Sequence, residues 1–164
     1  MDIFNFLDFT DPLVIMFVVD LIIALVIGFL IGAERESRGK DAGISTHTFV
    51  IVGAMLFTFL SMVVDPSSKS RIAAQIVTGI GFLGAGIILK DGAKVRNLTT
   101  AASIWFAGAI GMAIGFDYHE IAIIAAVASV IIPRVPHISK LKTVKNGRVA
   151  ANQEENNSMQ FSDD

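Results

Sequence analysis

LVIMFVVDLIIALVIGFLIGA, residues 13–33, holds one charged side chain, Asp20, in an otherwise apolar run. A helix needs about 20 such residues, rising about 1.5 Å each, to cross the hydrocarbon core of a bilayer. The run therefore predicts a membrane-spanning helix. We expect this helix to be retained rather than cleaved as a signal peptide, because residues 1–12 contain three Asp and no Lys or Arg.

Four more segments lack Asp, Glu, Lys and Arg: residues 44–64, 72–89, 98–116 and 121–133. The first three are long enough to span, and the last reaches that length only if it begins near Tyr118 and continues to Val135. The sequence thus predicts an all-α polytopic membrane protein with five transmembrane helices. We divide it into an outer N-terminal segment (1–12), a transmembrane domain (13–135) and a basic, then polar tail (136–164), which we expect to be disordered.

The overall composition agrees with a membrane protein and excludes other classes. Hydrophobic residues make up 53% of the 164-residue chain and charged residues only 17%, with a mean hydropathy of +0.65. So little charge could not cover the surface of a small water-soluble domain. The absence of Cys rules out disulfides, zinc–thiolate sites and cysteine nucleophiles.

The distribution of basic residues predicts the orientation. With five spans, two loops and the C-terminal stretch share one side, and eleven of the thirteen Lys and Arg residues fall there. The positive-inside rule then places the N-terminus outside and the C-terminus in the cytoplasm. We expect a multi-pass membrane protein. The basic stretch after the last span is a topology determinant that also allows contact with anionic lipid.

Small residues predict how the helices associate, because close backbone approach replaces hydrophobic attraction between helices in lipid. The glycines expected at helix contacts are Gly28, Gly32, Gly79, Gly81, Gly84, Gly86, Gly111 and Gly115. Residues 72–89 carry the densest set, so we expect this helix to be central and enclosed. Three roles are open for these glycines: they allow close packing within one subunit, they form the contact of a homodimer, or they line a passage for a ligand.

No motif predicts an enzyme or a nucleotide site. The run Gly79 to Gly84 matches G-x-G-x-x-G, but it lies inside an uncharged membrane segment instead of opening a helix after a strand. The three His residues form no paired zinc-ligand motif, and neither G-x-S-x-G nor a P-loop occurs. We therefore expect no catalytic residues, no cofactor, no metal site and no nucleic-acid partner.

Several polar residues are functional candidates because of where they lie. Asp20 is costly inside a span, so it is either functional or hydrogen-bonded to a Ser or Thr of a neighbouring helix. Arg71 and Gln75, four residues apart, form either a polar entrance or, for Arg71, a loop ion pair with Asp65. The remaining candidates lie in the loops on the predicted cytoplasmic side, where they pair, cap a helix or fix two spans in register: Glu34, Arg35, Arg38, Asn97, Thr99 and Thr100.

Three blocks in this order resemble the MgtC/SapB family of bacterial membrane proteins. They are GAERESRGKDAGISTH (32–47), SRIAAQIVTGIGFLGAGIIL (70–89) and NLTTAASIW (97–105). The resemblance implies five spans in the inner membrane and a role in survival under magnesium limitation and, in some pathogens, in virulence. It also implies action on membrane partners such as the ATP synthase or a magnesium pump. Thr99 stands where some members carry a functionally important Asn.

The chain departs from the family pattern in two places. Residues 68–70 separate the Asp65-Pro66-Ser67 sequence from Arg71, so no family role is carried over to Asp65. Longer members end in a soluble regulatory domain of the ACT type, whereas this sequence ends in a short polar tail. We therefore expect no regulation through such a domain.

Two functions remain as hypotheses. The favoured one is a non-enzymatic regulator that binds other membrane proteins, or a second copy of itself, through its small-residue faces. The alternative is a small transporter or channel for a cation such as Mg²⁺, with Asp20, Gln75 and, as a third candidate, Asp65 on the path. A magnesium site usually needs one or two carboxylates besides its waters, and only Asp20 lies within a span.

Overall fold

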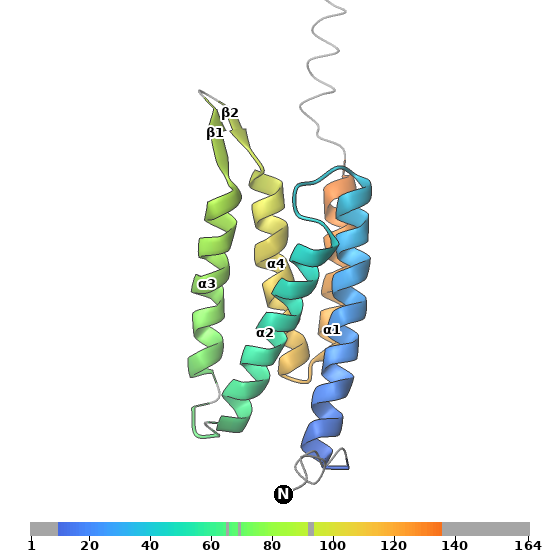
Figure 1. Ribbon diagram of the computed structural model, residues 1–164, viewed down its shortest axis with the longest axis vertical. Coiled ribbons are helices and arrows are strands. Elements are labelled where there is room, and N and C mark those ends of the chain that lie inside the picture. Colours follow the sequence, from blue (N-terminus) through green and yellow to red (C-terminus); the bar gives the residue numbers. More distant parts are fainter. Residues whose placement is uncertain (1–9, 65, 69, 92–93, 136–164) are drawn as a thin grey trace, which may run out of the picture. The chain divides into compact units, whose positions relative to one another are not determined.

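The computed structural model describes residues 10–64, 66–68, 70–91 and 94–135. The chain divides into two units, residues 1–132 and 133–164, and only residues 133–135 of the second are among the described residues. The predicted tail, 136–164, and most of the predicted outer segment lie outside the described residues. In the first unit, five helices form one bundle (Figure 1).

The helices agree with the five predicted apolar segments. Their bounds are α1 Pro12–Ser37, α2 Ile44–Val64, α3 Arg71–Ile87, α4 Leu98–Gly115 and α5 His119–Ile131, followed by a short 3-10 turn, Ile132–Arg134. Asp11 caps α1, because its side chain accepts a hydrogen bond from the Leu13 N–H at 2.8 Å and Pro12 needs no N–H partner. The chain leaves α1 through Gly39, whose φ of +63° suits glycine.

One predicted loop contains structure that the sequence pattern did not indicate. Strands β1 (Leu89–Asp91) and β2 (Lys94–Arg96) form an antiparallel hairpin between α3 and α4, with Leu89 opposite Arg96. Helix α3 consequently ends at Ile87, two residues before the end of the uncharged segment. We call the end of the bundle that carries this hairpin the hairpin end. There α1 and α3 end, and α2 and α4 begin (Figure 1).

Helices α2 and α4 form the centre of the bundle. Each packs against the other and against α1 and α3, and α4 also contacts α5. One core lies among α1, α2, α4 and α5, with Ile51, Met55, Ile110 and Ile114 fully enclosed. A second core joins α3 to α2 and α4. The prediction that residues 72–89 form the central helix was wrong, because α3 lies at the edge of the bundle and packs against α2 and α4 only on its Ala73, Ile76, Ile80 and Gly84 side.

The glycines fall into two groups by what surrounds them. A Cβ on Gly111 would overlap the carbonyl oxygen of Ile51, and one on Gly115 would lie 2.5 Å from that of Met55, so these glycines let α4 approach the backbone of α2. Gly28 and Gly32 do the same for α1 against the first turns of α2. In contrast, Gly79, Gly81 and Gly86 of α3 have open space where a Cβ would be.

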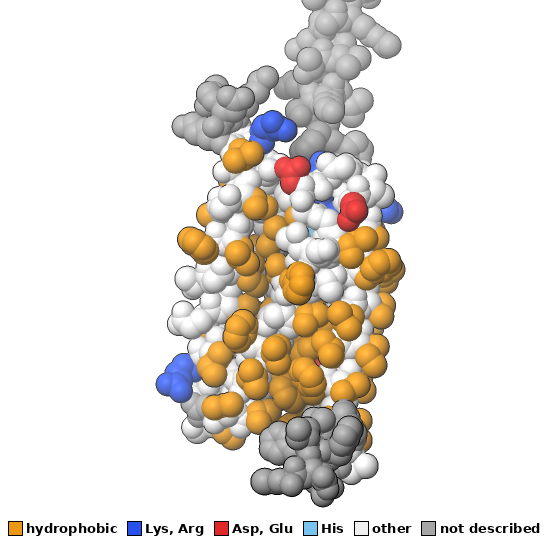
Figure 2. Space-filling view, viewed as in Figure 1, with side chains coloured by type: hydrophobic (Ala, Val, Ile, Leu, Met, Phe, Trp, Pro, Cys, Tyr) orange, Lys and Arg blue, Asp and Glu red, His pale blue; other side chains and the backbone are white. Residues whose placement is uncertain are grey.

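The surface of the bundle is suited to lipid. Large hydrophobic side chains cover the middle of the visible face, while charged groups gather toward the two ends (Figure 2). Helices α1, α2 and α4 are long and apolar enough to cross a membrane, whereas α3 has 17 residues and α5 has 13. The structure therefore supports a helical membrane protein, and crossings by α3 and α5 stay predictions.

Candidate functional site

The hairpin end contains a buried polar cluster, which consists of Glu34 and Arg35 of α1, His47 of α2, and Thr100 and Ser103 of α4. Arg35, His47 and Thr100 are 1%, 0% and 2% exposed. His47 and Glu34 lie close enough to Arg35 for their charges to interact. Two of the resemblance blocks, 32–47 and 97–105, thus meet here although some 50 residues separate them in the sequence.

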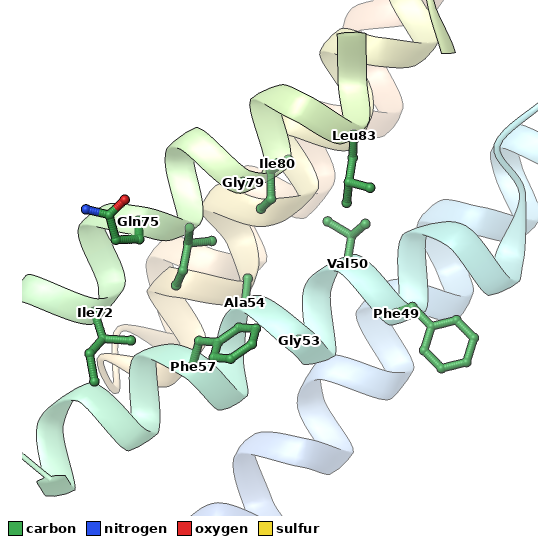
Figure 3. Close-up of a pocket in the computed structure, with 11 residues that line it drawn as sticks. Phe49, Val50, Gly53, Ala54, Phe57, Ile72, Gln75, Gly79, Ile80 and Leu83 are labelled. Carbon is green, nitrogen blue, oxygen red and sulfur yellow. The ribbon is translucent and has the colours of Figure 1, made fainter. Parts of the chain in front are cut away.

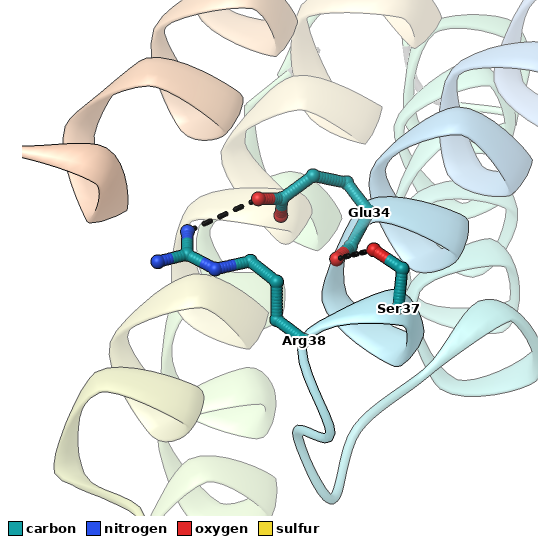
Figure 4. Close-up of polar contacts among 3 residues, drawn as sticks. All are labelled: Glu34, Ser37 and Arg38. Atoms are coloured by element: carbon teal, nitrogen blue, oxygen red, sulfur yellow. Dashed lines mark hydrogen bonds and ion pairs between the residues drawn. The ribbon is translucent and has the colours of Figure 1, made fainter.

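The end of α1 is held by its own side chains. Glu34 accepts a hydrogen bond from the Nη1 of Arg38 at 3.1 Å, and the Ser37 hydroxyl donates to the Glu34 carbonyl at 2.8 Å (Figure 4). Glu36 accepts from the Ile44 N–H at 3.2 Å, which satisfies a free donor at the start of α2. A Cβ on Gly43 would lie 2.5 Å from the Glu36 carboxylate, so a larger residue there would displace this exposed side chain from its contact with Ile44.

His47 links α2 to α4. Its Nδ1 lies 3.0 Å from the Gly43 carbonyl oxygen, and its Nε2 lies 3.3 Å from the Oγ of Ser103. The Ser103 hydroxyl also reaches the Thr100 carbonyl at 2.8 Å. A hydroxyl has a single hydrogen. If the Nδ1–H donates to the Gly43 carbonyl and the Ser103 hydroxyl donates to the Thr100 carbonyl, Ser103 has no hydrogen left for Nε2. The contact between Nε2 and Ser103 is then a hydrogen bond only when Nε2 also carries a hydrogen, which the Ser103 oxygen accepts.

Arg35 differs from its neighbours because its charged group has unmet hydrogen-bonding capacity. Its Nε and Nη2 atoms are buried and have no hydrogen-bond partner in the described part of the chain. Arg38, the C-cap residue that follows α1, is paired with Glu34 and far more exposed. The buried cluster therefore presents a guanidinium edge with two free donors.

A second polar group joins α1 to the start of α5. Asp20, 2% exposed, lies 2.7 Å from the Nε2 of His119, and the Nδ1 of His119 lies 3.5 Å from the exposed carboxylate of Asp117. One ligand atom from each residue lies within 4.8 Å of the other two, a spacing that a metal ion could bridge. Of the two alternatives predicted for Asp20, the hydrogen bond to a Ser or Thr is not what the structure shows, since the partner is a histidine.

A groove between α2 and α3 contains Gln75, another of the predicted functional residues. It has a volume of about 510 Å³ and is lined mainly by apolar side chains of both helices, and Val50 points toward Leu83 across it (Figure 3). Gln75 lies in its wall, and Arg71 is the first residue of α3. The predicted ion pair of Arg71 with Asp65 lies outside the described residues, because Asp65 is not among them.

The predicted site residues therefore lie at three separate places. Glu34, Arg35, Arg38 and Thr100 come together at the hairpin end, where Thr99 is exposed. Asp20 lies with His119, and Gln75 lies in the groove. Asn97 occupies the N-cap position of α4 but makes no capping hydrogen bond, and instead donates to the Ile87 carbonyl at 3.2 Å.

Sequence reasoning missed four residues of these sites: His47, Ser103, Asp117 and His119. The motif search covered histidines only as paired zinc ligands. His47 could have been identified as a site residue, because it ends the first resemblance block. Nothing in the sequence indicates the contact of His119 with Asp20, which joins residues 99 positions apart.

Comparison with known proteins identifies the family. The sequence profile of the MgtC family matches residues 21–139, which include α2 to α5 and all of α1 after Asp20. The chain belongs to the MgtC family. Protein MgtC of Salmonella typhimurium is 45% identical over 111 residues, which cover 68% of this chain and 48% of that protein. Protein MgtC of Brucella abortus is 50% identical over 105 residues, covering 63% and 44%.

Membership of the MgtC family confirms the resemblance predicted from the three sequence blocks. This chain spans about half the length of the curated MgtC relatives it matches. No solved structure matches it significantly. The hairpin-end cluster lies within the matched region, as do Asp117 and His119 of the second group, whereas Asp20 lies one residue before it.

Proposed function

We propose that this MgtC-family chain is a multi-pass protein of the bacterial inner membrane, with its N-terminus outside and its C-terminus in the cytoplasm. It acts without catalysing a reaction, by binding and modulating other membrane proteins during adaptation to low magnesium. Family membership supports the membrane role, and the basic residues of the hairpin-end loops support the orientation. The membrane ATP synthase and a magnesium pump are the first partners to test.

The observation that carries this proposal is the outer face of α3, defined as Ala74, Thr78, Gly81 and Ala85. All four are exposed, and they recur at spacings of four, three and four residues, so they lie on one side of the helix. A lipid-facing helix usually exposes large apolar side chains, as α5 does with Ile121, Ile123, Ile124 and Val127. Small residues instead allow another transmembrane helix to approach closely.

Replacing Gly81 with leucine tests this face. A side chain at Gly81 has open space, so we expect Gly81→Leu to leave the bundle folded and to remove the partner. The measurement is photo-crosslinking from Thr78 in living cells, followed by identification of the crosslinked proteins. We expect at least a tenfold loss of the specific partner.

Ala109→Leu is the matched control. Ala109 is an exposed small residue on α4, away from the outer face of α3. It should keep the crosslinked partner at the level of the unmodified protein. Recovery of lipid alone, or equal partner loss in both variants, would contradict the proposal. A crosslink to a second copy of this chain would indicate that the outer face of α3 forms a homodimer instead of binding another protein.

The triad of Asp20, Asp117 and His119 favours one alternative, a path for a divalent cation, because its ligand atoms lie within 4.8 Å of one another. Under the regulator proposal, purified protein in liposomes moves no more Mg²⁺ than empty liposomes do. Flux above that background that Asp20→Asn abolishes would replace the regulator with a transporter. Flux that survives Asp20→Asn would count against a path through the triad.

A further inference from the structure

The strongest unexplained feature of the bundle is the side chain of Arg35. It is 1% exposed, and its Nε and Nη2 atoms lack hydrogen-bond partners in the described residues. These two nitrogens lie on the same edge of the guanidinium group. That edge presents two parallel N–H donors, the geometry with which arginine binds two oxygens of a carboxylate or phosphate.

Leaving this edge empty is energetically unfavourable. A buried charge without a partner costs several kcal/mol, and the cost is usually met by an opposite charge that also accepts hydrogen bonds. The nearest acidic group, Glu34, directs one carboxylate oxygen to Arg38 at 3.1 Å. His47 and Arg38 are the other titratable groups within electrostatic range, and neither supplies negative charge. The charge of Glu34 offsets part of that of Arg35, but the Nε–Nη2 edge still lacks an acceptor, which an anion from outside the described residues would supply.

The position of Arg35 along α1 indicates which anion is available. Helix α1 has 26 residues, so it is about 39 Å long and exceeds the roughly 30 Å hydrocarbon core. Arg35 is two residues from its end, so when α1 crosses the bilayer Arg35 lies beyond the hydrocarbon core, toward the layer of lipid phosphate groups. Arg38, Lys40 and Arg96 lie at the same hairpin end and add positive charge that attracts anions.

We propose that the Nε–Nη2 edge of Arg35 binds a phosphate group, supplied either by a phospholipid headgroup or by free inorganic phosphate. His47 and Ser103 lie in the same cluster, but their hydrogens are used in bonds to Gly43, Ser103 and Thr100, so the free donors are those of Arg35. Both guanidinium nitrogens are enclosed in this structure, so binding requires a local opening of the hairpin end and is expected to be slow. This inference does not depend on the regulator proposal, because the site lies at the hairpin end and involves no residue of the α3 outer face.

The test uses the full chain in nanodiscs with two separate arms. In the first, discs of zwitterionic phosphatidylcholine are titrated with inorganic phosphate. In the second, phosphatidylglycerol is added to the discs without free phosphate. Thermal stability and native mass spectrometry measure binding in both. We expect a rise in melting temperature and a retained ligand in one arm, which identifies the source of the phosphate.

Arg35→Lys keeps the charge but removes the planar edge, so we expect at least a tenfold loss of affinity. Arg38→Lys is the matched control, since Arg38 caps the same helix but is already paired with Glu34. The affinity of this variant for phosphate should stay within about twofold of that of the unmodified protein. Equal binding by the unmodified protein and Arg35→Lys would overturn the proposal. So would the absence of any stabilisation of the unmodified protein in both arms.

A measurement on the unmodified protein covers the case in which Arg35→Lys does not fold. Solid-state NMR detects the dipolar coupling between ¹⁵N in the arginine side chains and ³¹P of the ligand. We expect a coupling at the resonance of the buried arginine, with nitrogen and phosphorus about 4 Å apart, as in a direct hydrogen-bonded pair. No such coupling in either arm would reject the phosphate site.

Discussion

Gly111→Ala is expected to destabilise the bundle by about 3 kcal/mol, even though the change adds one methyl group. The added Cβ would overlap the carbonyl oxygen of Ile51 and lie 2.8 Å from the Cβ of Ala54. Backbone atoms cannot rotate away, so α2 and α4 must separate at the centre of the bundle. The free energy of unfolding, measured by denaturant titration in one detergent, checks this value.

Gly53→Ala is the control for this experiment. Gly53 also lies within a helix, α2, but no atom lies within 4 Å of the place where a Cβ would be. Because alanine favours helix more than glycine does, we expect no loss and a gain of up to about 1 kcal/mol. If both variants lose the same stability, close approach of α4 to α2 is not what Gly111 provides.

His119→Ala is expected to cost about 3–5 kcal/mol, because it leaves the carboxylate of Asp20 buried without its partner. The two side chains are 2.7 Å apart, and Asp20 is 2% exposed. Replacing both residues by leucine should recover much of the loss, since no buried charge then remains. The same unfolding measurement on single and double variants yields the coupling energy between them.

Asp117→Ala distinguishes the contribution of the exposed His119–Asp117 pair from that of the buried His119–Asp20 pair. Asp117 lies 3.5 Å from the same histidine, but its side chain is 65% exposed. An exposed ion pair contributes at most about 1 kcal/mol, so we expect a change no larger than that. A loss of equal size in Asp117→Ala and His119→Ala would show that burial of Asp20 does not decide the energetics.

The local elements were predictable because they depend on neighbouring residues. Each uncharged run became one helix, and the ends followed local signals such as Asp11 before Pro12 and Gly39 after α1. The hairpin at Leu89–Arg96 was missed, because its strands are three residues each and carry charges typical of a loop. The family was also within reach of the sequence, since the three blocks keep their order and spacing.

The partners of buried polar groups could not be predicted in the same way. Asp20 was recognised as costly, but nothing near it in the sequence indicates His119. Arg35 was one charge among several in a loop-proximal run, and its burial depends on how the start of α2 and the start of α4 close over the end of α1. Such contacts join residues far apart along the chain, so local patterns carry no information about them.

The amino-acid sequence by itself determined that this chain forms five apolar helices suited to a membrane, their ends to within a few residues, and which family it belongs to. Only the tertiary structure decided that α2 and α4, rather than the glycine-rich α3, occupy the centre. The physical reason is that small residues permit close approach without requiring it. The Cβ position of Gly111 lies against the backbone of α2, whereas that of Gly81 lies in open space, although both are glycines in apolar helices.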